Sequence, residues 1–114
     1  MNVAQRATTE LVKTYSLSAE QAKEVVKIQA SKYEALGKLE SLKATDMTKY
    51  IAKRLSTFET ADNGLMVLLD ESQLKIFKQQ QIEKTNRFDT LVMGMKKQGI
   101  KQEDIDKKLA DMEF

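Results

Sequence analysis

The 114-residue chain contains no proline, cysteine, histidine or tryptophan, and it has only four glycines. The absence of proline removes the residue that most often breaks a helix. Without cysteine and histidine, the chain lacks a thiol nucleophile, a Ser-His couple and the usual ligands of zinc. The acidic residues do not follow the spacing of a calcium loop, and there is no glycine-rich phosphate loop. The sequence therefore predicts that the protein is not an enzyme and binds no cofactor or metal.

The residues that are abundant favour helices. Alanine, leucine, lysine, glutamate, glutamine and methionine dominate, and the β-branched residues are scattered rather than alternating. Hydrophobic residues make up 41% of the chain and aromatic residues 6%, which suffices for a thin helical core. The length fits one domain. We therefore expect a single all-α domain over residues 1–114.

The charged residues are unevenly distributed, although the net charge is only +2. Residues 11–58 carry nine basic and five acidic side chains, and residues 72–101 carry seven basic and two acidic ones. Charge runs of this kind usually mark solvated faces. Because acidic residues interrupt the basic ones and there are few aromatic residues for stacking, we expect no nucleic-acid partner.

The sequence has no segment that resembles a membrane span or a signal peptide. No apolar run approaches the roughly 18 residues that a membrane-spanning helix needs. The first residues lack the basic start and the apolar stretch of a signal peptide. The sequence is compatible with a mature terminus behind a removed signal peptide and also with a start at Met1.

The spacing of apolar residues predicts five helices. Apolar side chains recur at intervals of three and four, as on one face of a helix. Ala44-Thr45-Asp46 is expected to connect the second helix to the third, with Thr45 or Asp46 as the N-cap. Long helices joined by short links fold into antiparallel hairpins. The expected ranges are residues 3–13, 19–43, 47–69, 71–98 and 101–112.

Three further predictions concern two glycine positions and one row of mainly apolar residues along the fourth helix. Asn63-Gly64 usually signals a turn, but the apolar pattern keeps its phase across it, so we expect one continuous third helix. Gly37 is expected to mark a bend or a close helix crossing. In the fourth helix, a heptad seam predicts packing along its whole length against one or two neighbours. The seam consists of Leu74, Phe77, Gln81, Lys84, Phe88, Leu91 and Met95.

The charges of the third helix suggest a homodimer. Lys49, Lys53 and Arg54 lie near its start, and Glu59 and Asp62 lie towards its end. This order opposes the helix dipole. An antiparallel second copy alongside would place the basic end of one helix against the acidic end of the other.

One helix-start pattern occurs twice, 52 positions apart. In each copy a small residue with a side-chain oxygen follows a leucine and precedes a glutamine by three positions. This is the spacing of a capping box, in which the two side chains satisfy each other's backbone N–H groups. We therefore interpret the motif residues as structural. They are Leu17, Ser18 and Gln21 in the first copy and Leu69, Asp70 and Gln73 in the second.

Two such starts at this spacing resemble the LTxxQ motif family, the Spy/CpxP-like helical proteins of the bacterial envelope. Ser18 and Asp70 stand where the family has threonine. The likeness extends over residues 15–97 as a sparse pattern. It implies a hairpin-in-hairpin fold of four helices shaped like a shallow cradle, often an antiparallel homodimer. It also implies a place in the periplasm.

The resemblance implies an ATP-independent, chaperone-like or envelope-stress-related protein that binds partly folded proteins. Metal-responsive relatives use His, Cys or clustered Met, and this chain has no His or Cys. The alternative is a helical interaction module that binds one specific envelope protein and does not hold unfolded chains. Charge and expected exposure suggest five client-binding candidates, each also explained as a solvated side chain: Lys49, Lys53, Arg54, Lys75 and Lys78.

Overall fold

The computed structural model describes residues 2–110, and this range contains five helices and no strand. The expected all-α class is confirmed. Met112, which was expected at the end of the fifth helix, lies outside the described residues. The helices are α1 (Val3–Tyr15), α2 (Ala19–Thr45), α3 (Met47–Leu68), α4 (Glu71–Lys97) and α5 (Gln102–Ala110).

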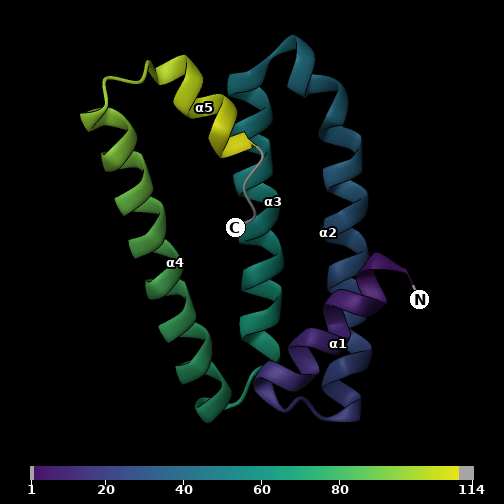
Figure 1. Cartoon of the computed structure of the whole chain (residues 1–114). Coiled ribbons are helices and arrows are strands. Elements are labelled where there is room, and N and C mark those ends of the chain that lie inside the picture. The colour runs from purple at the N-terminus through teal and green to yellow at the C-terminus, as the bar shows by residue number, and fades with distance from the viewer. Residues whose placement is uncertain (1, 111–114) are drawn as a thin grey trace.

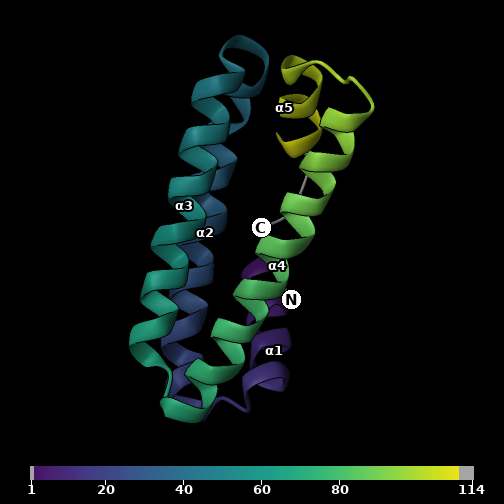
Figure 2. The ribbon, with the colours of Figure 1, turned by 90° about the vertical axis from the view of Figure 1, so that its left-hand side faces the viewer.

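The helices α2 and α3 form a long antiparallel hairpin, and α1 lies across α2 (Figure 1). The α1–α2 and α3–α4 links lie at the same end of the molecule, which we call the lower end after Figure 1. From there α4 runs at an angle to α3, and α5 folds back towards α3 at the upper end (Figure 2). The molecule measures 47 × 29 × 22 Å along its principal axes.

The turn between α2 and α3 is tighter than the sequence suggested. The helix α2 continues through Thr45, so Ala44 and Thr45 do not belong to the connection as predicted. The Thr45 hydroxyl donates to the Ser41 carbonyl (3.2 Å), a bond within the helix that prevents it from capping α3. Asp46 alone joins the helices: its N–H donates to the Leu42 carbonyl, and its carboxylate accepts from the Lys49 N–H (3.1 Å).

The helix α3 is continuous through Asn63-Gly64, as predicted. A Cβ atom on Gly64 would lie 3.3 Å from Cδ1 of Ile28 in α2, so α3 approaches α2 closely at this glycine. Gly37 faces open space with no atom within 4 Å of its Cβ position. The prediction of a close crossing at Gly37 is therefore wrong, and the close approach occurs at Gly64.

The main hydrophobic core lies at the lower end. It combines residues from the ends of α1 and α3, the starts of α2 and α4, and the two leucines that precede the N-caps. The rings of Tyr15 and Phe77 lie 6.4 Å apart between centroids. The core consists of Tyr15, Leu17, Val25, Leu65, Leu69 and Phe77.

The predicted seam of α4 is buried only near its ends. Phe77 and Met95 are buried, but Leu91 is 43% exposed. The helix packs against α1 near its start and approaches α3 closely at few positions. The prediction of packing along the whole seam is therefore wrong, because polar Gln81 and Lys84 interrupt the apolar face and α4 diverges from α3 (Figure 1).

Two glycine substitutions should change stability in opposite directions. Gly37→Ala should raise the free energy of unfolding by about 0.5–1 kcal/mol, since alanine favours the helix and nothing obstructs its methyl group. Gly99→Ala should lower it by about 1 kcal/mol, because Gly99 has a φ of +76°. Urea denaturation of both variants measures the changes. Shifts of the same sign would contradict the conformations assigned here.

Candidate functional site

Both copies of the helix-start motif form capping boxes. At α2, the Ser18 hydroxyl accepts from the Gln21 N–H (3.1 Å), and Oε1 of Gln21 accepts from the Ser18 N–H (2.9 Å). At α4, the Asp70 carboxylate accepts from the Gln73 N–H (2.8 Å), and Oε1 of Gln73 accepts from the Asp70 N–H (2.9 Å). Each box pairs backbone N–H groups that a helix start otherwise leaves without partners.

The two glutamines also bind each other across the lower end. Nε2 of Gln21 donates to Oε1 of Gln73 (2.8 Å), and Nε2 of Gln73 donates to Oε1 of Gln21 (3.2 Å). We call this arrangement the glutamine pair. Because an amide is both donor and acceptor, each side chain closes its own capping box and still binds the other.

Each glutamine of the pair also binds the end of a helix from the other half of the chain. Nε2 of Gln21 donates to the Leu68 carbonyl at the end of α3 (2.7 Å). Nε2 of Gln73 donates to the carbonyls of Tyr15 (3.1 Å) and Ser16 (3.4 Å) at the end of α1. Carbonyls at helix ends lack partners within the helix. The glutamine pair therefore connects the starts of α2 and α4 and the ends of α1 and α3 by hydrogen bonds.

The helix-start motif identifies these two glutamines in the sequence, but the contact between them was not predicted. Gln73 is buried, with 6% of its surface exposed, and Gln21 is half-buried. A buried side-chain amide requires hydrogen-bond partners, and here the two motif copies satisfy each other. The signal in the sequence that could have indicated this contact was the repeat itself. In both copies the leucine of the motif lies in the same hydrophobic core, and the glutamine lies beside it.

Two further hydrogen bonds hold α4 above the glutamine pair. The Tyr15 hydroxyl donates to Oε1 of Gln80 (2.6 Å), and Nε2 of Gln81 donates to the Asp62 carboxylate (3.0 Å). Burial, with a smaller contribution from the nearby negative charge of Asp62, raises the pKa of Tyr15 above its usual value. The phenol thus stays protonated and able to donate.

The client-binding candidates lie in two separate places. Lys49 and Lys53 are exposed on the first turns of α3 at the upper end, and Lys75 and Lys78 are exposed on the first turns of α4 at the lower end (Figure 1). Arg54 is half-buried, and its guanidinium lies 5.0 Å from the centre of the Phe58 ring. The structure therefore does not bring the five residues into one patch.

The most exposed part of the fold is the middle of α4, although the heptad spacing of α4 predicted that this region is packed against other helices. Residues 82–87 are all exposed, and six residues exceed one 3.6-residue turn, so the helix is open on every side there. Large apolar side chains are among the exposed ones: Ile82 is 56% exposed and Met93 58%. No residue in the range 82–93, which we call the open segment of α4, is fully buried.

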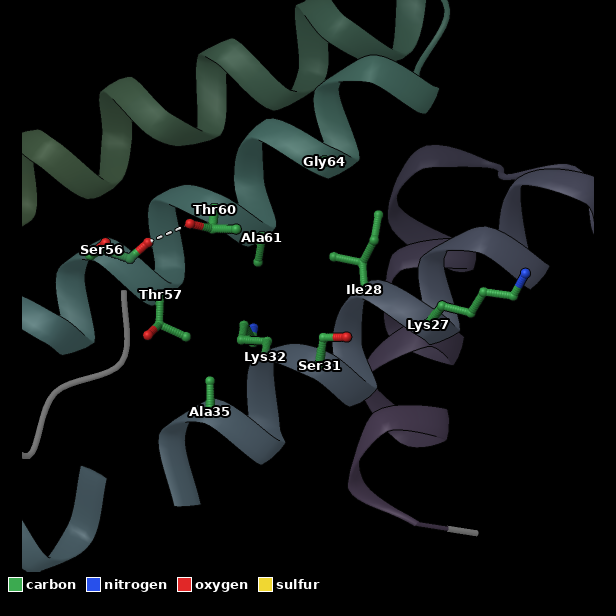
Figure 3. Close-up of a pocket in the computed structure, with 10 residues that line it drawn as sticks. All are labelled: Lys27, Ile28, Ser31, Lys32, Ala35, Ser56, Thr57, Thr60, Ala61 and Gly64. Carbon is green, nitrogen blue, oxygen red and sulfur yellow. Dashed lines mark hydrogen bonds between the residues drawn. The ribbon is translucent and has the colours of Figure 1, made fainter. Parts of the chain in front are cut away.

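A groove of about 570 Å³ runs between α2 and α3 on another face (Figure 3). Three of its polar side chains have partners close by in the sequence: the Thr57 and Thr60 hydroxyls donate to carbonyls of their own helix, and Lys27 pairs with Glu24 (3.2 Å). The remaining lining residues are Ile28, Ser31, Lys32, Ala35, Ser56, Ala61 and Gly64.

Within residues 2–110, no three acidic, histidine or cysteine side chains lie together as a metal site would require. None of the described helices combines the length and apolar character needed to cross a bilayer. Comparisons with protein-family models, with curated proteins and with solved structures find no match for this chain.

Replacing either member of the glutamine pair with alanine should destabilise the protein by about 2–3 kcal/mol, because helix-end carbonyls lose their donors and the helix start loses its capping bond. The double substitution Gln21→Ala/Gln73→Ala should cost about 1 kcal/mol less than the sum of the single ones, since the residues bind each other. Chemical denaturation of the four proteins completes the cycle.

The chain contains a matched control for this cycle. Gln5 closes a capping box with Asn2 at the start of α1 but makes no tertiary hydrogen bond among the described residues. Gln5→Ala should therefore cost only about 0.5 kcal/mol. A cost equal to that of Gln73→Ala would show that capping alone explains the motif.

Stability should decrease in alkali through Tyr15. In the unfolded chain this phenol ionises near its usual pKa of 10.0, whereas the folded protein holds it protonated to higher pH. The unfolded state thus binds fewer protons above about pH 10, and the free energy of unfolding falls as pH rises. The advantage of the wild type over Tyr15→Phe should be constant below pH 9 and shrink above pH 10. A difference that is independent of pH would refute the raised pKa.

Proposed function

We propose that this protein is an ATP-independent, chaperone-like helical protein that binds partly folded proteins. The observation that supports the proposal is the open segment of α4, which exposes Ile82, Leu91 and Met93 on a helix that the fold leaves largely unpacked. Exposed apolar side chains grouped on one element often mark a surface for binding proteins.

The open segment also carries charge of the kind that attracts a client. Lys84 and Arg87 are exposed among its apolar residues, and Lys96 and Lys97 follow in the last turn of α4. Basic side chains attract acidic chains over a distance of about 10 Å at moderate salt. The exposed apolar side chains of the open segment then hold a client by small contacts that separate again without a nucleotide-driven step.

We also propose that the protein is related to the LTxxQ motif family, and the glutamine pair supports this. The motif copies meet in space, which gives the repeat a physical reason to occur as a pair. On that basis we propose a periplasmic location. We also propose a homodimer, in which the exposed charges of α3 lie against those of a second copy.

The test is suppression of aggregation of an unrelated, slowly unfolding protein without ATP. Replacing Ile82, Leu91 and Met93 together with glutamine should reduce suppression at least severalfold, because the apolar contacts are removed from an exposed surface. The control is Val67→Gln with Val3→Gln, since these valines are exposed outside α4. Equal loss in both variants would contradict a site on α4.

The basic candidates are tested in the same assay. Replacing Lys49, Lys53 and Arg54 with glutamate should weaken suppression more than replacing the exposed Lys13, Lys23 and Lys38, which changes the net charge equally. Light scattering on the same samples reports whether the protein is a dimer. No suppression by the wild type at severalfold excess would favour the alternative, a module with one specific partner.

A further inference from the structure

Within residues 2–110, the contacts that attach α5 to the rest of the fold are those of apolar side chains. Ile105 is 1% exposed and Ala110 2% exposed, and Leu109 is half-buried. The hydrogen bond from Gln102 to Asp106 and the ion pair of Lys107 with Glu103 both lie within α5. Among the described residues, no polar interaction joins α5 to another helix.

The surface that receives α5 lies at the upper end, where α3 and α4 are far apart (Figure 1). Here α5 packs on α3, whose first buried residue is Tyr50. On α4 the last buried residue is Met95. Both side chains are about 5% exposed, and Ile105 and Ala110 of α5, the helix that packs on α3, are almost fully buried as well, so α5 covers apolar surface at this end.

The link to α5 permits the helix to leave without disturbing α4. Gly99 has a φ of +76°, and its N–H donates to the Lys96 carbonyl (3.1 Å). The Ile100 N–H donates to the Met95 carbonyl (3.1 Å), which completes the end of α4 before α5 begins. Isolated helices shorter than about 12–15 residues have little stability in water, so α5, of which nine residues are described, should unfold when it undocks.

From these observations we infer that α5 is a detachable lid over a binding site for a short amphipathic helix. The kind of partner follows from α5 itself, which fills the site with apolar residues at positions i, i+4 and i+5, namely Ile105, Leu109 and Ala110. A partner helix with this spacing competes with α5 for the same surface. The inference does not depend on chaperone activity, because a module with one specific partner would use the site equally.

The test is binding of a fluorescent synthetic peptide with the sequence of residues 100–110 to the full-length chain. Ile105→Asp undocks α5 and should raise the affinity for the peptide at least tenfold over the wild type. The control Lys108→Gln changes the net charge equally at an exposed position and should bind as weakly as the wild type. A peptide that itself carries Ile105→Asp should bind to none of the three chains.

Equal affinity of the wild type and Ile105→Asp for the peptide would overturn the inference, as would equal binding of both peptides. Hydrogen exchange on the wild type provides a second measurement if the variant does not fold. Amides of α5 should exchange at least tenfold faster than those in the middle of α2 and α3, because the lid opens without global unfolding. Exchange at the same rate would show that α5 is part of the global folding unit, and the lid would be rejected.

Discussion

The hydrogen bonds between Gln21 and Gln73 hold together the two places at the lower end where the chain reverses direction. Each amide serves its own capping box, the other amide and a helix-end carbonyl from the other half of the chain. Glutamate would supply only acceptors, and asparagine is one methylene shorter. The chemistry and length of glutamine are therefore both needed, and the pair sets where α1, α2, α3 and α4 meet.

The strength of this constraint contrasts with the rest of the structure. The main core surrounds the glutamine pair, so the ends of α1 and α3 and the starts of α2 and α4 form one packed unit. Beyond Gln81, α4 leaves that unit, and at the upper end α5 docks through a few apolar side chains. Contacts are thus dense at one end and sparse at the other, which concentrates local opening and exposed surface away from the glutamine pair.

Local sequence rules predicted the helices well because these rules concern neighbours along the chain. Capping requires residues three positions apart, and the spacing of apolar residues showed that α3 continues through Gly64. The same rules failed for α4, where the heptad spacing suggested a packed seam. Spacing shows which side chains share a face, but it does not show whether another helix lies against that face.

The all-α class, the approximate limits of the helices and the two glutamine-closed helix starts follow from interactions between residues a few positions apart, so they could be predicted from the sequence. Three features emerge only in the folded chain: the two glutamines bind each other, Gly64 rather than Gly37 lies against another helix, and the middle of α4 is open. These features join residues far apart in the chain or depend on the angle between helices. Such an angle results from all the packing contacts together, and no single stretch of sequence specifies it.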